Sequence, residues 1–415
     1  MKITHLSQSN ATGGAATYVA RTIDSTTFVG IENKLLASSL KYPLNNMYIV
    51  SDSGSKKFNF LRAKTSQTLD KKIRIFEKTQ EYRYKSLNFM GAVSSSELNK
   101  SSSDIIHLHW INGGLISIKQ IGKIKKPLVW TMLDMWPFLG GEHYLLESDL
   151  PRFIDGYYKH NRPNNDYGVD LCKVVWNQKK KYYGNLHLIS PSKWLASQAS
   201  SSVLFYDKKI EIIPPPIDID LFKPMPKKQA REKYKIDDNL FVIGFLGGVS
   251  ERKGWEYVYK LCSHTNLNSD WRFLLGGASI NSYSKYKDIG RTTILAGKLN
   301  SNQDLVSFYA SLDVLVVPSI AEAYGLVAQE AQSCGIPVIV FSGTGAVDTI
   351  LNGCTGFVAE QKSVLGLLKI LEHLYMLTIE QRNKISHAAR ARAKNEWNYK
   401  VIGDRHMNFY SNVSL

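Results

Sequence analysis

Residues 313–337 read DVLVVPSIAEAYGLVAQEAQSCGIP. An apolar run of strand length ends at Pro318, a loop follows it, and a helix is expected to begin near Gly325 and to end at the closing Gly-Ile-Pro sequence. Glu322 then lies in the loop and Glu330 inside the helix. A buried strand followed at once by a helix is the repeating unit of a parallel sheet, so this stretch predicts an α/β fold.

Short β-rich runs separated by helix-length spacers occur along the whole chain, in two series. The first series is residues 2–6, 47–51, 104–108, 127–131 and 186–190, and the second is residues 242–246, 272–275, 293–296, 314–317 and 338–341. This alternation is typical of βαβ units. A length of 415 residues also favours two domains over one. We therefore expect two doubly wound, Rossmann-like domains.

Three consecutive prolines that end at Pro216 stiffen the chain between the two series, as a domain connector does. We expect a hinge near residues 192–215, with a first domain over residues 1–195 and a second over residues 196–395. Apolar and aromatic residues at roughly helical spacing predict a further helix, residues 396–415, that packs back on the first domain.

The composition is that of an ordinary soluble protein, with 44% hydrophobic and 21% charged residues. Apolar runs stay well short of the roughly 20 residues that span a membrane. The first residues, Met1 to Leu6, read as a strand and not as a secretory signal, so we expect a cytoplasmic protein. The four cysteines form no zinc-binding pairs and no disulfide framework, and we expect no metal site.

The formal net charge of +16 predicts an anionic partner. Lysines and arginines between Lys56 and Lys85 alternate with aromatic and aliphatic residues, a pattern that suits an anionic membrane surface. An ordinary solvated loop and helix explains the same pattern equally well. Nucleic acid is a weaker candidate partner, because the sequence has no RNA-recognition signature and no zinc-finger spacing.

The two glutamates of the opening stretch lie where a parallel sheet binds ligands. That place is the carboxyl edge of the sheet, and a helix N-terminus there offers free N–H groups and a positive dipole to phosphate. Two carboxylates beside a phosphate would repel it unless they face neutral hydroxyls, which sugars and ribose supply. The alternative is that Glu322 and Glu330 are ordinary surface residues.

This stretch resembles the Glu-x7-Glu signature of the retaining glycosyltransferases of family 4, and the resemblance runs from Leu299 through Tyr309 to Gly356. It implies the GT-B fold, with the substrates in a cleft between two Rossmann-like domains. It also implies that Glu322 contacts the donor sugar and Glu330 the nucleotide ribose. The further donor-binding positions that it implies are Ser319, Ala323, Tyr324, Gly325, Leu326 and Val327, the last five through backbone N–H groups.

Other segments resemble further donor-binding elements of the same family. Lys253 matches the lysine that holds the pyrophosphate, and Arg252 beside it could replace the arginine that many relatives carry where this chain has Gly248. Fixed cations of this kind stabilise a departing diphosphate without a metal ion. Gly13 and Gly14 follow the first strand, as in the donor-facing loop of the family, although most such glycine pairs are simply turns.

Two segments of the first half carry candidate active-site residues. His107 and His109 point to one face at the end of a strand; we reject a zinc site for want of further ligands, and the resemblance implies that His109 lines the cleft. Residues 129–138 resemble an element of a subgroup that acts in bacterial surface-polysaccharide synthesis. Leu133 occupies the position of its active-site histidine, Asp134 keeps the pattern, and His143 could substitute for the missing histidine.

These observations predict a retaining, metal-independent glycosyltransferase without a cofactor. Its donor would be a UDP- or GDP-linked sugar, and its acceptor a glycan or a lipid-linked glycan in bacterial polysaccharide biosynthesis. Glu322, Lys253, Arg252, His109 and Asp134 are the expected catalytic residues. Two alternatives remain: a sugar-nucleotide 2-epimerase of the same fold, and a non-catalytic nucleotide- or glycan-binding relative.

Overall fold

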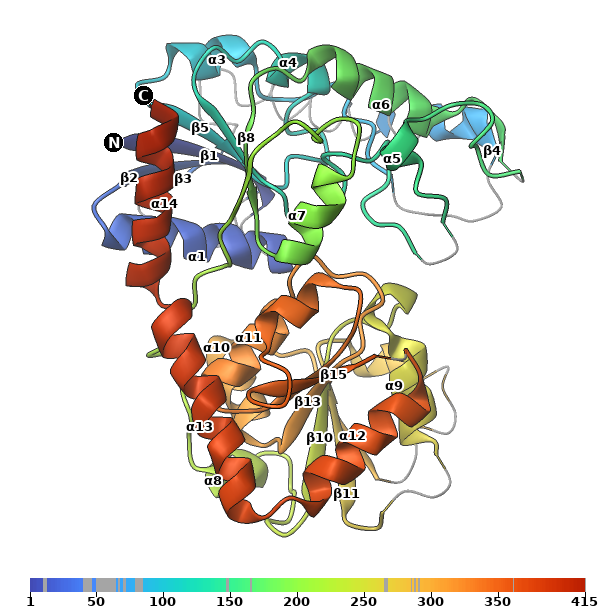
Figure 1. Cartoon of the computed structure of the whole chain (residues 1–415), viewed down its shortest axis with the longest axis vertical. Helices are drawn as coiled ribbons and strands as arrows, with labels where there is room; N and C mark the ends of the chain where they lie inside the picture. The colour runs from blue at the N-terminus through green and yellow to red at the C-terminus, as the bar shows by residue number, and fades with distance from the viewer. Residues whose placement is uncertain are drawn as a thin grey trace. The chain divides into compact units, whose positions relative to one another are not determined.

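The chain was analysed as a computed structural model that describes residues 1–9, 13–39, 47–49, 65, 68–69, 72–78, 85–146, 149–164, 166–264, 268–284, 286, 289, 292–360 and 362–414. It divides into two compact units (Figure 1). The first unit comprises Met1–Pro216 and Tyr399–Leu415, and the second comprises Ile217–Asn398. Most of the segment between Lys56 and Lys85 lies outside the described residues.

The first unit is built on a sheet of seven parallel strands in the order β3-β2-β1-β5-β6-β8-β9. In chain order these strands are β1 (Lys2–Ser9), β2 (Glu32–Ser39), β3 (Met47–Ile49), β5 (Ile105–Leu108), β6 (Leu128–Thr131), β8 (His187–Ser190) and β9 (Ile210–Ile212). The helices are α1 (Gly14–Phe28), α3 (Ser95–Lys100), α4 (Ile118–Ile121), α5 (Arg152–Asp155), α6 (Leu171–Tyr182), α7 (Lys193–Ser200) and α14 (Tyr399–Ser414). A separate antiparallel pair joins β4 (Glu77–Lys78), which follows the 3-10 helix η1 (Arg74–Phe76), to β7 (Tyr167–Gly168).

The last helix, α14, belongs to the first unit, where it lies beside α1 (Figure 1). The hydroxyl of Ser25 donates a 2.7 Å hydrogen bond to the carbonyl of Tyr399. Ile402 and Tyr410 pack on the sheet with Ile3 of β1. The first unit therefore covers one face of its sheet with a helix from the far end of the sequence.

The expected boundary near residue 195 is wrong. The chain leaves the first unit after Pro216 and returns at Tyr399, because α7 and β9 remain with the first sheet. Strand β9 pairs with β8, and a signal of only three residues, Ile210–Ile212, is too short to be recognised as a strand from its composition. The three prolines that end at Pro216 do mark the point where the chain passes from the first unit to the second.

The second unit has a sheet of six parallel strands in the order β12-β11-β10-β13-β14-β15. The strands are β10 (Phe241–Leu246), β11 (Trp271–Gly276), β12 (Thr293–Gly297), β13 (Val314–Val317), β14 (Val338–Phe341) and β15 (Gly356–Ala359). The α-helices are α8 (Lys227–Glu232), α9 (Trp255–Cys262), α10 (Asn302–Ala310), α11 (Leu326–Ser333), α12 (Val364–Met376) and α13 (Ile379–Glu396). The 3-10 helices are η2 (Glu251–Lys253), η3 (Ile280–Tyr283) and η4 (Gly345–Thr349).

The environment of strand β13 explains why all four of its residues are apolar. Successive side chains of a strand point to opposite faces of its sheet. Leu315 and Val317 pack into the core formed with α10, α11 and α13, whereas Val314 and Val316 pack into the core formed with α9 and α12. Both faces are covered, so all four positions are apolar. The two predicted doubly wound domains are thus confirmed.

No helix among the described residues is long and apolar enough to cross a membrane.

Candidate functional site

The loop between β13 and α11 places Glu322 at the carboxyl edge of the second sheet. Strand β13 ends at Val317, and α11 begins after Gly325, which has a left-handed backbone with φ of +102° that suits glycine. The backbone N–H of Gly345 donates a 2.8 Å hydrogen bond to the carbonyl of Glu322, which fixes the loop from the side of η4. The expected donor-binding positions from Ser319 to Val327 therefore occupy this loop and the start of the helix.

Two cations lie against the carboxylate of Glu322. The ammonium of Lys253 donates to Glu322 Oε2, and the guanidinium of Arg252 lies 3.6 Å from the same oxygen. The hydroxyl of Ser319 donates to it at 3.4 Å. Burial raises the pKa of Glu322, but the charges of Lys253 and Arg252 outweigh burial and hold the pKa below its ordinary value of 4.5. Glu322 is therefore ionised at neutral pH.

Gly254 sets the distance between the basic pair and the glutamate loop. It has a left-handed backbone with φ of +70°, and a Cβ atom at this position would lie 1.8 Å from the carbonyl oxygen of Pro318. Two backbone contacts join the loops: the N–H of Ile320 donates to the carbonyl of Arg252 at 3.0 Å, and the Arg252 guanidinium donates to the carbonyl of Ala321 at 3.0 Å. Only glycine permits this approach, and the approach brings the cations to Glu322.

Glu330 lies inside α11 and is buried. The phenol of Tyr309, on α10, donates a 2.6 Å hydrogen bond to Glu330 Oε2. Sequence reasoning missed this contact, because the partners belong to different helices and lie 21 positions apart. A buried tyrosine on an apolar helix face is more often a core residue, and Tyr309 also packs in the core of the second unit.

In the first unit, Gly13 and Gly14 lie at the carboxyl edge of β1. Gly13 precedes α1 with φ of +93°, Gly14 is its first residue, and both are exposed. Backbone N–H groups at a helix start can bind an anion. Residues 10–12 of this loop lie outside the described residues.

His109 does not face an open surface. It is buried in the core of the first unit with His5 and His107, and its Nε2 shares a 2.9 Å hydrogen bond with His5 Nδ1. The ligand nitrogens of the three imidazoles lie within 4.8 Å of one another, so His5 supplies the third possible metal ligand that sequence reasoning missed. However, His5 is also hydrogen-bonded to Asn33. Both ring nitrogens of His107 are in hydrogen bonds, one with Thr131 and the other with Tyr410 of α14. We interpret the three as a packed, neutral network, because burial lowers the pKa of each.

Asp134 lies just after β6 and accepts three hydrogen bonds. His143 Nδ1 donates to its Oδ2 at 2.6 Å, Trp110 Nε1 donates to the same oxygen at 2.9 Å, and the backbone N–H of Trp136 donates to Oδ1 at 3.0 Å. The structure thus brings together the two residues that the sequence singled out around Leu133. It adds a third, because the hydroxyl of Ser86 lies 2.9 Å from His143 Nε2.

Residues 226–392, within the second unit, match the family model described as Glycosyl transferases group 1. The capsular polysaccharide biosynthesis glycosyltransferase CapM of Staphylococcus aureus is 28% identical over 195 residues, which are 45% of this chain and 50% of that protein. The D-inositol 3-phosphate glycosyltransferase of Mycobacterium tuberculosis is 26% identical over 302 residues, which are 70% of this chain and 57% of that protein. The chain thus spans about half the length of the curated relatives it matches.

Solved structures resemble the whole chain. HepE of Anabaena, in complex with UDP and glucose, superposes with a TM-score of 0.67 at 16% identity and covers 99% of this chain and 100% of its own. The sucrose-phosphate synthase of Thermosynechococcus elongatus gives a TM-score of 0.64 at 16% identity, covering 99% of this chain and 98% of its own. At such identities the likeness concerns the fold, and the predicted GT-B fold is confirmed.

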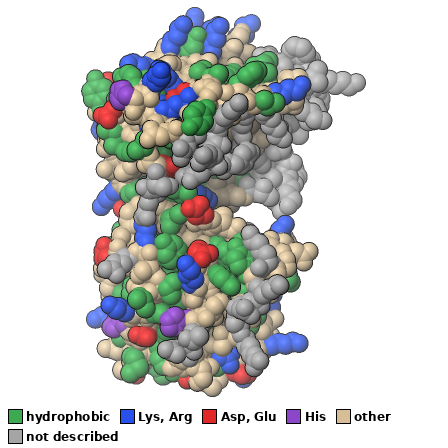
Figure 2. All heavy atoms as spheres, turned by 90° about the vertical axis from the view of Figure 1, so that its right-hand side faces the viewer, with side chains coloured by type: hydrophobic (Ala, Val, Ile, Leu, Met, Phe, Trp, Pro, Cys, Tyr) green, Lys and Arg blue, Asp and Glu red, His purple; other side chains and the backbone are tan. Residues whose placement is uncertain are grey.

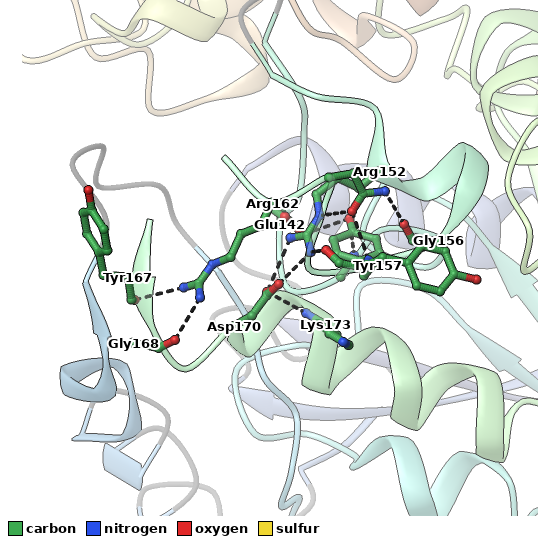
Figure 3. A network of polar contacts seen from close by, with 12 residues as sticks. Glu142, Arg152, Gly156, Tyr157, Arg162, Tyr167, Gly168, Asp170 and Lys173 are labelled. Carbon is green, nitrogen blue, oxygen red and sulfur yellow. Dashed lines mark hydrogen bonds and ion pairs between the residues drawn. The ribbon is translucent and has the colours of Figure 1, made fainter. Parts of the chain in front are cut away.

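The two units differ in the contacts that hold their candidate residues in place. In the second unit, Glu322 and Lys253 belong to two different loops and form an ion pair. In the first unit, the segment before His143 is held by a polar network (Figure 3): Tyr157 donates to Glu142, and the Arg152 guanidinium pairs with Asp170 at 2.6 Å and lies 4.4 Å from the Tyr157 ring. Asp170 in turn caps α6 by accepting from the N–H of Lys173.

Proposed function

We propose that the chain is a retaining glycosyltransferase that transfers a sugar from a nucleoside diphosphate sugar to a hydroxyl of a glycan or lipid-linked glycan. One observation carries this proposal: Lys253 and Arg252 converge on Glu322 beside the start of α11. Cations next to a helix N-terminus suit a diphosphate, and an ionised carboxylate at the same point suits sugar hydroxyls.

The expected step forms a bond between the acceptor oxygen and the anomeric carbon while the bond from that carbon to the diphosphate breaks. The acceptor proton passes to an oxygen of the leaving diphosphate on the same face, which gives retention. Lys253 would move from Glu322 to the diphosphate, and the start of α11 would add its dipole. Glu330, held by Tyr309, would accept hydrogen bonds from ribose hydroxyls. The charge that this step needs comes from side chains, so we propose a metal-independent reaction.

The comparisons support the class of donor and the setting. HepE was solved with UDP and glucose, and CapM is named for capsular polysaccharide biosynthesis. We therefore propose a UDP- or GDP-linked donor and a role in bacterial surface-polysaccharide synthesis.

The decisive experiment measures binding and turnover of a panel of UDP- and GDP-sugars by calorimetry and by release of UDP or GDP. We expect at least one nucleotide sugar to bind the wild-type protein, and Lys253→Ala to cut turnover by about a hundredfold or more, as for loss of one charge-stabilising donor. Lys260→Ala is the matched control, because Lys260 is an exposed lysine of α9 that pairs only with Glu256 among the described residues. Near-normal turnover by Lys253→Ala, or binding of no nucleotide sugar, would contradict the proposal.

We also propose that the first unit docks on the anionic cytoplasmic face of the membrane. Apolar side chains are exposed around the β4–β7 pair: Ile75 is 75% exposed, Phe76 64% and Tyr167 62%. On the first unit's part of the face in Figure 2, hydrophobic side chains alternate with lysines and arginines. Such a mixture suits an anionic bilayer surface.

Sedimentation with vesicles of phosphatidylglycerol and phosphatidylcholine tests the docking. We expect wild-type protein to bind and Phe76→Ser to bind less, with the exposed Met376→Ser of the second unit as control. Equal binding by the Phe76 and Met376 variants would count against this surface.

A further inference from the structure

Four side chains of the first unit meet at the carboxyl edge of its sheet. Trp110 lies two residues after β5 ends, Asp134 follows β6, and His143 and Ser86 come from the segments that pair beside them through Lys85 and Glu142. In open α/β sheets, ligands bind at this edge. The proposed donor site belongs to the second unit, so a ligand of this cluster would be a different molecule.

Asp134 determines which nitrogen of His143 carries the proton. A carboxylate can only accept, so His143 Nδ1 donates to Asp134 Oδ2 over 2.6 Å. His143 Nε2 then keeps its lone pair and accepts from the Ser86 hydroxyl at 2.9 Å. The amide of Asn112 lies 3.4 Å from the same nitrogen. This is the order of a serine–histidine–aspartate relay, in which Nε2 is built to receive a hydroxyl hydrogen.

The Ser86 hydroxyl can leave Nε2 without moving its backbone. The N–H of Ser86 donates to the carbonyl of Gly141 at 2.8 Å, and the Ser86 carbonyl accepts from Trp136 Nε1 at 2.9 Å. The main chain is thus fixed at both ends, whereas a serine hydroxyl swings by rotation about one bond. Ser86 and His143 are both buried here, and rotation of the Ser86 hydroxyl would leave His143 Nε2 to accept from another hydroxyl.

Trp110 gives the site a face that suits a sugar ring. Its indole lies beside the His143 ring, with centroids 5.7 Å apart, and Trp110 is partly exposed. Its N–H is tied to Asp134, so the ring orientation is fixed. An aromatic face next to a hydrogen-bonding nitrogen offers contact to the C–H face of a sugar while its hydroxyls are bound.

Lys179 holds the segment that carries Asp134 and His143. It is fully buried on α6, and its ammonium donates to the carbonyls of Trp136, Leu139 (3.0 Å) and Gly140 (2.6 Å). The titratable side chains near the relay include Asp134, Glu142, Lys85 and Lys179, and burial lowers the pKa of Lys179. Because its supports are buried, the relay is preorganised for a ligand.

We propose that His143 Nε2, oriented by Asp134 and flanked by Trp110, binds the hydroxyl group of the acceptor, the glycan that receives the transferred sugar. The proposal rests on the proposed glycosyltransferase function and assigns the acceptor to named residues. In this structure the Ser86 hydroxyl occupies the position of the acceptor hydroxyl until a glycan replaces it, and His143 Nε2 then accepts a hydrogen bond from the glycan hydroxyl.

The test measures the binding of methyl glycosides of glucose, galactose, mannose and N-acetylglucosamine by saturation-transfer NMR. We expect the wild-type protein to bind at least one of them, His143→Gln to bind it about tenfold more weakly, as for loss of one good hydrogen bond, and Ser86→Ala to bind at least as tightly as wild type. His160→Gln, at an exposed histidine, is the matched control.

Opposite directions for the His143 and Ser86 variants separate a binding site from a merely structural cluster, since structural damage would weaken both. A measurement on unmodified protein guards against misfolded variants: in ¹⁵N-histidine-labelled wild type, glycoside addition should shift one Nε2 resonance. No glycoside binding, or equal binding by His143→Gln, overturns the inference. If wild type still binds a UDP- or GDP-sugar in that case, the proposed function stands; if it binds neither, the proposed function fails as well.

Discussion

The phenol of Tyr309 donates a 2.6 Å hydrogen bond to Oε2 of Glu330, from a neighbouring helix. A buried carboxylate needs such a donor, because leaving it without one costs the desolvation free energy of a charge. Tyr309 thus holds the carboxylate that we propose binds the nucleotide ribose.

Tyr309→Phe should therefore weaken nucleotide binding while the fold is kept. We expect affinity for UDP or GDP to fall by about tenfold, because hydrogen bonds to charged groups contribute about 1.5 to 3 kcal/mol and Glu330 would lose part of its orientation. Titration calorimetry with the two nucleotides measures this. Tyr257→Phe is the control, because the described residues give the Tyr257 hydroxyl no hydrogen bond while its ring packs on Phe341. Unchanged affinity in Tyr309→Phe would show that Glu330 needs no such support.

Gly254→Ala should disrupt the proposed donor site. Its Cβ would lie 1.8 Å from the carbonyl oxygen of Pro318, so the loop that carries Lys253 must move. We expect a loss of more than about 3 kcal/mol in unfolding free energy, or a folded protein with little nucleotide-sugar binding. Gly248→Ala is the matched change in the same loop, because a Cβ at Gly248 meets nothing within 4 Å. It should alter stability by no more than about 0.5 kcal/mol. Urea unfolding of both variants decides, and equal behaviour would refute the steric argument.

The same open space allows an arginine at position 248. The family resemblance of this segment implies an arginine at this position in many relatives, and Gly248 is exposed. Gly248→Arg should raise affinity for nucleoside diphosphates, with a steeper salt dependence than wild type, since a further cation would face the diphosphate. Calorimetry at two salt concentrations would measure it; weaker binding at low salt would contradict the placement of the diphosphate.

The ion pairs of Glu322 should make stability depend on pH in the acidic range. Lys253 and Arg252 hold the Glu322 pKa below 4.5 in the folded protein. A depressed carboxyl pKa contributes stability above the unfolded-state pKa, and this contribution disappears as pH falls through the folded pKa. The difference in unfolding free energy between wild type and Glu322→Gln should therefore be constant from about pH 8 to 5 and shrink below about pH 4.5. Glu372→Gln, on the exposed side of α12, should show no such change.

The buried histidines should weaken the first unit on mild acidification. Burial lowers the pKa of His5 and of His406 from 6.5 to about 4. Between these values the unfolded chain takes up protons that the folded chain refuses, so stability falls as pH drops from 6.5 and levels off near pH 4. The loss amounts to about 3 kcal/mol for each such group. The unfolding free energy, measured with denaturant across this range, should depend less on pH for His406→Gln than for wild type. His387→Gln, at an exposed histidine, should match wild type.

Local patterns revealed the elements of the fold but not their long-range partners. Val314 to Val317 is apolar throughout because both faces of β13 are covered, and that signal is local. The pairing of Glu322 with Lys253 joins residues 69 positions apart, and it depends on a loop approach that only Gly254 permits. Side chains alone gave no sign of that approach.

The first unit illustrates the same limit. The family resemblance implied that His109 lines the cleft, but His5 of β1, 104 positions away, contacts it, and His109 is buried. Asp134 and His143 are only nine positions apart, and their proximity could be suspected from the sequence. The contact of Ser86 with His143 could not be suspected. It depends on an isolated β-bridge between Lys85 and Glu142, in two short segments whose sequences have no strand pattern.

The return of α14 to the first unit has a consequence for biosynthesis. His107 Nδ1 is bonded at 2.7 Å to the hydroxyl of Tyr410, and Ile402 and Tyr410 close the core above β1. While the chain emerges from the ribosome, this apolar sheet face waits for a helix that is translated some 180 residues later, after the whole second unit Ile217–Asn398. The second unit can fold first although it is made second, and a premature stop near residue 398 would leave it intact beside an uncovered, aggregation-prone first unit.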